Sequence, residues 1–94
     1  MNLRNEARNR PCQIRLPGCD GGGETTVLAH YRLSGYAGVG FKSPDIMGAW
    51  ACYHCHDIVD GRRSVGEATR TDIRLAHAEG VLRTIHKLSE EGKL

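Results

Sequence analysis

The sequence predicts a small α+β domain in which two short strands and a cysteine-bearing turn precede a short helix and a long C-terminal helix. Its 94 residues suffice for a single domain, 1–94, with a modest core, since 39% of the residues are hydrophobic and 5% are aromatic. A β-branched, alternating segment predicts the first strand, and apolar residues at spacings of three and four predict the last helix. Four cysteines in two close pairs indicate a staple that would supplement such a core.

The N-terminal quarter predicts a helical turn and then a compact loop. Residues 2–9 are expected to form a short basic helix, with Arg4 and Arg8 one turn apart, and Pro11 ends it. Residues 12–24 contain Pro-Gly and three consecutive glycines, which is turn chemistry throughout. We therefore expect no regular structure there.

The middle of the chain predicts two strands joined by a loop. Residues 25–33 begin with β-branched side chains and then alternate, which indicates a strand with His30 and Arg32 on one face. Residues 34–45 form a glycine-rich loop, and residues 46–51 form a second extended segment.

Two helices are expected in the C-terminal half, over residues 53–60 and 65–91. The apolar stripe predicted for the longer helix consists of Leu75, Ala78, Leu82, Ile85 and Leu88. Gly80 interrupts this helix at a cost of about 1 kcal/mol relative to alanine. We expect His77 and His86 to occupy outward positions.

The four cysteines form two pairs from two turns, which favours a structural zinc site. They are Cys12, Cys19, Cys52 and Cys55. Zinc takes four soft or borderline ligands in a tetrahedron, and such pairs supply them without a large core. The second pair has the usual two-residue gap, whereas the gap in the first pair is longer. Disulfides and buried free thiols are the alternatives.

The N-terminal residues favour metal binding over disulfides. Residues 1–10 are rich in arginine and asparagine and lack the apolar core of a signal peptide. No segment approaches the roughly eighteen apolar residues of a membrane span. We therefore expect a cytoplasmic protein without membrane contact, where close cysteine pairs bind metal more often than they oxidise.

Cys52, Cys55 and His56 also match the attachment sequence of a c-type haem. Covalent haem attachment normally follows export, which residues 1–10 do not support. It would also leave the first cysteine pair without a role. Zinc explains more of the sequence than haem does.

His56 lies four residues before Asp60 on the predicted helix, so the two side chains share one face. An imidazole and a carboxylate at that spacing can hold one divalent cation. A carboxylate is poorly placed at a helix C-terminus without a cation, although Asp60 could equally be a helix-end residue without a function. His54, between the cysteines, is expected to face solvent.

The formal net charge of +2 gives little indication of a partner. Arginines heavily outnumber lysines, and arginine suits bidentate contact with phosphate. An ordinary solvated surface explains the same arginines equally well. Any preference for nucleic acid must come from where they lie in the fold.

Four motifs occur in a specific order along residues 3–63. They are Cys12-Gln-Ile-Arg-Leu-Pro-Gly-Cys19, Thr26-Val-Leu-Ala-His30-Tyr-Arg-Leu, Lys42-Ser-Pro-Asp45 and Ala51-Cys52-Tyr-His-Cys55-His56-Asp-Ile-Val-Asp60. In this order and spacing the chain resembles the HNH, or ββα-metal, endonuclease superfamily. Within it, the chain resembles most closely the small prophage-encoded YbcO-like nucleases.

The resemblance implies a ββα-metal core with a catalytic site beside a structural zinc bound by the four cysteines. His30 matches the family's general base, which takes a proton from water, and His56 matches a ligand of the catalytic Mg²⁺ or Mn²⁺. Asp45 falls near the family's middle asparagine, which helps to orient the base. From its position on the His30 face, we infer that Arg32 steadies the phosphate.

Two positions depart from the family pattern. Many members carry an acidic residue just before the first histidine as a second metal ligand, and here that residue is Ala29. Asp45 replaces the asparagine and lies further from the cysteine turn than is usual. Asp60 is therefore the expected second ligand, with Asp45 as the runner-up.

The sequence as a whole predicts a metal-dependent DNA endonuclease that acts as a monomer, with the last helix packed on the ββα unit. The alternative is a non-catalytic zinc-ribbon module that binds DNA or a protein. That alternative needs the cysteines and the arginines but neither His30 nor His56.

Overall fold

The computed structural model describes residues 2–36 and 43–94. The described part contains a two-stranded sheet and three α-helices, which confirms the predicted α+β class. In chain order the elements are α1 (Leu3–Glu6), β1 (Val27–His30), the 3-10 turn η1 (Asp45–Met47), β2 (Gly48–Ala51), α2 (Tyr53–Val59) and α3 (Arg70–Glu90). The glycine-rich loop predicted at 34–45 falls partly on residues 37–42, outside the described residues.

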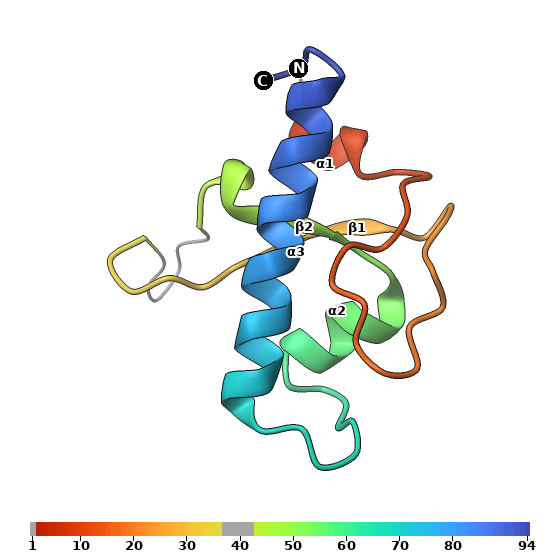
Figure 1. Cartoon of the computed structure of the whole chain (residues 1–94), viewed down its shortest axis with the longest axis vertical. Helices are drawn as coiled ribbons and strands as arrows, with labels where there is room; N and C mark the ends of the chain where they lie inside the picture. The colour runs from red at the N-terminus through yellow and green to blue at the C-terminus, as the bar shows by residue number, and fades with distance from the viewer. Residues whose placement is uncertain (1, 37–42) are drawn as a thin grey trace.

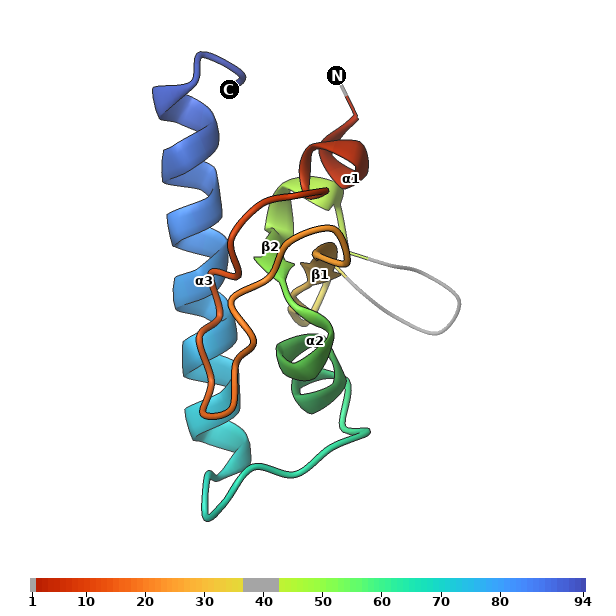
Figure 2. The same ribbon diagram turned by 90° about the vertical axis from the view of Figure 1, so that its right-hand side faces the viewer.

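Helix α3 runs along one side of the molecule, and the strands and α2 lie together on its other side (Figures 1 and 2). Both chain ends lie at the same end of the fold (Figure 1). Two ion pairs join these ends: Lys93 Nζ lies 2.5 Å from Glu6 Oε1, and Arg10 Nη1 lies 2.5 Å from Glu91 Oε2. Within the described residues, no helix combines the length and apolar character that crossing a membrane requires.

Helix α1 is shorter than the helix predicted at 2–9. It ends at Glu6, so Arg4 and Arg8 do not face each other along one helix as expected. Asn2 caps its start, with Oδ1 accepting from the amide of Arg4 at 3.0 Å. A φ of 66° at Asn9 turns the chain away from helical geometry soon afterwards.

The strands pair antiparallel with His30 opposite Gly48, and the first strand is four residues long instead of the predicted 25–33. The segment before it is a turn: the Thr26 hydroxyl donates to the carbonyl of Arg10 at 2.8 Å and accepts from the amide of Gly23 at 2.7 Å. The pairing ends at His30 because its partner strand begins only at Gly48.

Strand β2 is buried at all four positions, which makes it the centre of the core. The predicted extended segment 46–51 therefore divides into two parts, the end of the 3-10 turn and then the strand. The amide of Trp50 donates to the hydroxyl of Thr84 on α3 at 3.0 Å. This bond joins the long helix to the strand that faces it.

Helix α3 begins at Arg70 instead of the predicted residue 65. Thr69 and Asp72 form a capping box, because the Thr69 hydroxyl accepts from the Asp72 amide and the Asp72 carboxylate accepts from the Thr69 amide. These bonds hold the pKa of the Asp72 carboxyl below its usual value. The start of the helix is fixed by this cap.

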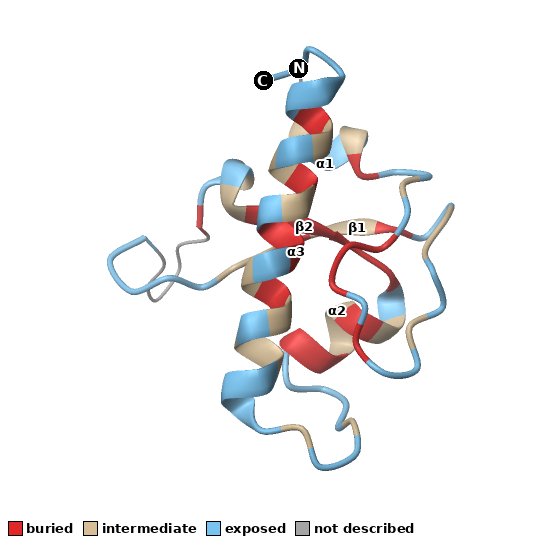
Figure 3. Ribbon diagram, in the orientation of Figure 1, coloured by how far each residue is buried: buried red, intermediate tan, exposed pale blue. Residues whose placement is uncertain are grey.

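The apolar stripe predicted for α3 is wrong in its first half and correct near its end. Leu75 is 60% exposed and Leu82 is 66% exposed, whereas Leu88 is buried and Ile85 packs against the core. Figure 3 shows exposed and buried positions along the whole helix. The buried positions are His77, Gly80, Val81, Thr84 and Leu88. Three of these five are polar or lack a side chain, which is why apolar spacing did not reveal them. The prediction that His77 points outward is wrong for the same reason.

Gly80 is the point where α3 comes closest to the N-terminal loop. A Cβ atom there would lie 3.1 Å from the carbonyl oxygen of Gln13 and 3.1 Å from Cγ1 of Ile14. The glycine that weakens the isolated helix therefore permits its docking. Behind this contact lies the larger part of the core, which includes Ile58 of α2 and Val81 of α3.

Candidate functional site

The four cysteines meet at one point, as predicted. Their sulfur atoms all lie within 4.8 Å of one another, and all four cysteines are free. Cys12 and Cys19 come from the N-terminal loop, while Cys52 and Cys55 come from the start of α2. The free thiols give no support to the disulfide alternative.

The geometry of this cysteine cluster fits zinc. Four sulfurs at about 2.3 Å from a tetrahedral zinc lie about 3.8 Å from one another. The Sγ atoms of Cys19 and Cys52 are 3.8 Å apart. Three of the four side chains are buried, and Cys19 is partly exposed. The cluster can therefore hold a metal ion such as zinc, with its ligands closed around it.

The cluster favours one thiolate and opposes the ionisation of its neighbours. A hydrogen bond from the Cys55 thiol lowers the pKa of Cys12 to about 4, and the same contact raises the pKa of Cys55. Burial raises the pKa of Cys19 to about 11. Four sulfurs this close cannot all ionise without a cation between them, so their full deprotonation and cation binding are coupled.

His54 links the two cysteine turns and does not simply face solvent as predicted. Its Nε2 donates to the carbonyl of Pro17 at 2.8 Å, and its Nδ1 accepts from Arg63 Nη1 at 2.8 Å. Gly18 makes room for this ring, because a Cβ there would lie 2.6 Å from His54 Nε2. The imidazole thus holds the first cysteine loop against α2.

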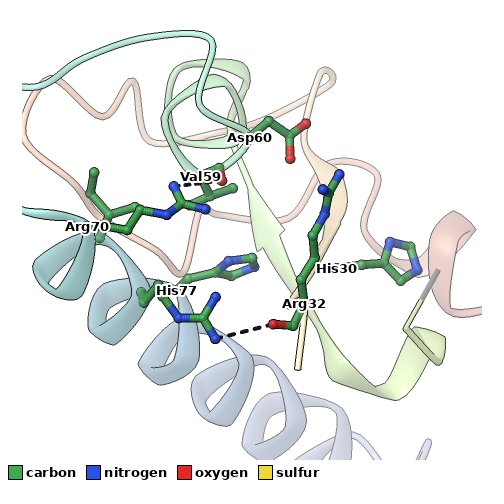
Figure 4. Close-up of a pocket in the computed structure, with 8 residues that line it drawn as sticks. His30, Arg32, Val59, Asp60, Arg70 and His77 are labelled. Carbon is green, nitrogen blue, oxygen red and sulfur yellow. Dashed lines mark hydrogen bonds between the residues drawn. The ribbon is translucent and has the colours of Figure 1, made fainter. Parts of the chain in front are cut away.

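A polar pocket lies between the end of β1, the end of α2 and the first turns of α3 (Figure 4). Its lining consists of His30, Arg32, Val59, Asp60, Arg70, Ile73, Arg74 and His77. Three of the predicted site residues, His30, Arg32 and Asp60, are among these. Asp45 contacts His30 from the start of η1.

His30 and Asp45 form a direct hydrogen bond, with Nε2 of the imidazole 2.7 Å from Oδ1 of the carboxylate. Arg4 Nε lies 3.4 Å from the same oxygen. The His30 hydrogen bond, helped by the charge of Arg4, holds the pKa of Asp45 below its usual value. An ionised Asp45 accepts a hydrogen bond from Nε2–H, and in that tautomer the lone pair of the imidazole lies on Nδ1.

His30 and Arg32 line the same pocket but point in different directions within it. Figure 4 shows the Arg32 guanidinium extending toward Asp60, whereas the His30 ring turns away. The hydrogen bond to Asp45 accounts for the direction of that ring. Both residues line the pocket, but the prediction that their side chains point the same way is wrong, because strand pairing ends at His30 and the ring is held by Asp45.

His56 and Asp60 lie side by side on α2, with Nε2 and Oδ2 3.2 Å apart. Two ligands that hold one ion at about 2.1 Å and at right angles are about 3.0 Å apart, so the pair fits a shared divalent cation. Both side chains are partly exposed, at 29% and 27%. Arg62 Nη2 also lies 3.2 Å from the Asp60 carboxylate.

The sequence analysis missed His77, which closes the inner side of the pocket. Its Nε2 donates to the carbonyl of Ala29 at 2.9 Å, directly before His30, and its ring meets Tyr31 edge-on at 5.1 Å. Burial lowers the pKa of His77, so it is a neutral donor. The sequence signal for its burial is that it precedes Gly80 by three residues and Val81 by four, which places all three on one helix face. A search for apolar residues alone does not find this face.

The sequence analysis also assigned no site role to Arg70 and Arg74. They lie four residues apart in the first turns of α3, and both line the pocket. Figure 4 shows the side chain of Arg70 extending from α3 toward Val59. No sequence motif contains these two arginines, because their position in the pocket depends on how α3 packs against the sheet and α2.

Comparison with known proteins gives consistent results. A chain described as "Structure of a putative bacteriophage protein from Escherichia coli str. K-12 substr. MG1655" is similar with a TM-score of 0.77 and 36% identity, covering 97% of this chain and 100% of that one. "Putative nuclease YbcO" of Escherichia coli K12 and "Putative nuclease ybcO" of Enterobacteria phage 82 are each 53% identical over 62 residues. Those matches span 65% of this chain and 65% of each relative. The family model described as "Putative nuclease YbcO" matches residues 1–93, and the chain therefore belongs to the YbcO family.

Proposed function

We propose that this protein is a metal-dependent endonuclease that hydrolyses DNA phosphodiester bonds on an HNH-like ββα core. The nuclease names of its relatives support the reaction class. The observation that carries the assignment is the His30–Asp45 hydrogen bond of 2.7 Å at a polar pocket beside Asp60. A carboxylate that orients an imidazole is the arrangement of a general base.

His30 acts as the base. Asp45 accepts a hydrogen bond from Nε2–H, so Nδ1 is available to take a proton from water as that water attacks phosphorus. The imidazolium that forms is stabilised by the charge of Asp45, whose lowered pKa keeps it ionised near neutral pH. Arg32, which lines the same pocket, steadies the negative charge on the phosphate.

His56 and Asp60 would hold the catalytic Mg²⁺ or Mn²⁺. When bound, such an ion supplies Lewis-acid stabilisation of the phosphate and the leaving oxygen. The protein's own contribution is to keep His56 Nε2 and Asp60 Oδ2 3.2 Å apart on consecutive turns of one helix. Two protein ligands leave the remaining coordination positions for water and substrate.

The four cysteines would bind a structural zinc that keeps the N-terminal loop on α2. This assignment rests on four sulfurs within 4.8 Å of one another. We expect the protein to act on DNA as a cytoplasmic monomer.

The second candidate is a zinc-ribbon module that binds DNA or a protein without cutting. One observation favours it: among the residues that the structure describes, only the cysteines gather three or more metal-ligating groups. This reading needs neither His30 nor His56.

Cleavage of supercoiled plasmid by wild-type, His30→Ala and His86→Ala proteins, with Mg²⁺ and with Mn²⁺, tests the proposal. His86 is an exposed histidine on α3 and serves as the matched control. We expect wild type and His86→Ala to nick or linearise the plasmid, and His30→Ala to be slower by at least about 100-fold with its fold and zinc content intact.

Equal rates for His30→Ala and wild type would remove His30 from the mechanism. If no protein cuts under either metal although zinc is bound, the binding module is the better account.

A further inference from the structure

Three arginines converge on the pocket from two separate parts of the fold. Arg32 follows β1, whereas Arg70 and Arg74 project from the first turns of α3 (Figure 4). Among the residues lining the pocket, Asp60 is the only carboxylate. Three arginines and one carboxylate give the lining an excess of positive charge, which attracts an anion.

Both guanidinium groups on α3 are held in place while most of their donors stay available. Arg74 Nη2 donates to the carbonyl of Arg32 at 3.2 Å, and its guanidinium carbon lies 4.6 Å from the centre of the Tyr31 ring. Arg70 Nη1 donates to the carbonyl of Val59 at 3.5 Å. A guanidinium has five N–H donors, so each group retains several for a ligand.

We propose that Arg70 and Arg74, together with Arg32, bind a phosphate group of the nucleic-acid backbone, which makes α3 part of the substrate-binding surface. Arginine forks match phosphate oxygens in paired hydrogen bonds. This inference rests on the proposed function for its choice of ligand, and it assigns α3 a role in positioning the substrate.

The lining indicates recognition of backbone and not of base. Apart from the charged and imidazole side chains it contains only Val59 and Ile73, and it has no phenylalanine, tyrosine or tryptophan ring on which a base could stack. Its two imidazoles are already hydrogen-bonded within the protein. Phosphate contacts fix the register of a nucleic acid without reading its sequence. The three arginines should therefore strengthen binding to unrelated sequences equally.

Asp60 opposes an anion in this pocket, and its neighbours offset that effect. Its carboxylate lies 3.2 Å from Arg62 Nη2 and 3.2 Å from His56 Nε2. A divalent cation held by His56 and Asp60 would further reverse the local charge. Phosphate and cation should therefore bind cooperatively, with the arginines holding the oxygens that the cation does not contact.

The test measures the affinity of short DNA duplexes of unrelated sequence for proteins that all carry His30→Ala, so that the DNA stays intact during the measurement. The parent protein for comparison carries His30→Ala alone. We expect Arg70→Gln and Arg74→Gln each to weaken binding about tenfold, by the same factor on every duplex. Each should also reduce the slope of log affinity against log salt concentration by about one unit.

Two kinds of control separate phosphate binding from a loss of fold or of net charge. Lys87→Gln removes one positive charge from the same helix, about 20 Å from Arg74 at 1.5 Å per residue, and should leave the salt slope nearly unchanged. Arg70→Lys and Arg74→Lys keep the charge and should restore the salt slope. Thermal unfolding of every variant reports on the fold, since both arginines also contact backbone.

The outcomes distinguish this inference from the proposed nuclease activity. If Arg70→Gln and Arg74→Gln bind DNA with the parent's affinity and salt slope, the inference is wrong even if wild type cuts plasmid. If they lose affinity and slope while Lys87→Gln does not, the inference holds even if wild type never cuts.

Discussion

The cysteine cluster and the His56–Asp60 pair are two candidate metal sites that begin at neighbouring residues, Cys55 and His56, yet their surroundings are opposite. In the cluster four ligands surround one point, and three of them are buried. The pair has two ligands, both partly exposed, at a polar pocket. One turn of α2 thus presents a closed site on one side and an open site on the other.

This difference matches the roles proposed for the two sites. A structural metal needs all its positions filled by protein, because its role is to hold segments together. A catalytic metal needs free positions for water and substrate. Breaking the closed site should therefore destroy the fold, whereas breaking the open site should destroy only the activity.

The largest effect is expected from Cys52→Ser. Cys52 caps α2, with its sulfur accepting from the Cys55 amide at 3.4 Å, and serine is also a good helix cap. The substitution therefore removes a zinc ligand while keeping the cap. Structural zinc contributes about 10 kcal/mol or more in small metal-dependent domains, which exceeds the stability of most domains of this size.

We expect Cys52→Ser to lose bound zinc and cooperative thermal unfolding, as measured by metal analysis and circular dichroism. Tyr53→Ser, at an exposed position in the same turn, is the control and should melt like wild type. A Cys52→Ser protein that keeps the wild-type melting temperature would show that the cluster does not hold the fold.

The next largest effect, on activity alone, is expected from His56→Ala. It should lower plasmid cleavage by at least about 100-fold and weaken Mn²⁺ binding, as followed by electron paramagnetic resonance, with zinc content unchanged. Asp57→Asn is the control, because Asp57 lies on the same helix but pairs with Arg62 and Arg63. Unchanged Mn²⁺ binding in His56→Ala would show that His56 is not a ligand of the divalent cation.

The closed site could be predicted from sequence, and the open site only in part. The two cysteine pairs indicated the cluster, because a structural zinc takes four ligands and the chain has four cysteines. The His56–Asp60 contact followed from helical periodicity, and the His30–Asp45 contact agrees with what the family resemblance implied. Each of these predictions depended on local spacing or on a motif.

What could not be predicted was the contribution of α3. Apolar spacing placed Leu75 and Leu82 inward, but the helix docks through His77, Gly80 and Thr84. Hydrogen bonds to β1 and β2 satisfy the two polar side chains, and a sequence pattern does not show such partners. The rotation of α3 also decides which arginines face the pocket, so their role became visible only in the structure.

A smaller effect, on the open side, is expected from His77→Phe. A somewhat larger aromatic ring replaces the imidazole, and the donor to the Ala29 carbonyl is lost, which should cost about 1–2 kcal/mol near neutral pH. Because burial lowers the pKa of His77, the unfolded chain takes up a proton before the folded one as pH falls below about 6.5. The contribution of His77 to the free energy of unfolding is therefore fully present above this pH and declines as the pH falls below it.

Urea unfolding of both proteins near pH 7.5 and near pH 5.5 checks this prediction. The difference in unfolding free energy should shrink at the lower pH, because phenylalanine has no proton to bind. A difference that grows on acidification would mean that folded His77 is protonated more easily than in the unfolded chain.

The smallest effect is expected from Gly80→Ala, where α3 meets the loop of the closed site. Alanine should stabilise the helix by about 1 kcal/mol, but its Cβ would press on the Gln13 carbonyl at 3.1 Å. That carbonyl also accepts from Arg83 at 2.8 Å, and the Gln13 amide donates to Trp50 at 2.7 Å, so the loop has little room to yield. Overpacking costs about 1–3 kcal/mol, which leaves a net loss of about 1 kcal/mol.

Because Gln13 adjoins Cys12, the strain from Gly80→Ala should also reach the closed site and hasten zinc release to a chelator, while Mn²⁺ binding at the open site stays unchanged. Glu79→Ala, at the exposed neighbouring position, should alter neither. If Gly80→Ala is more stable than wild type and releases zinc no faster, then the loop at Gln13 yields to the added methyl group. In that case α3 restrains the closed site no more tightly than the open site.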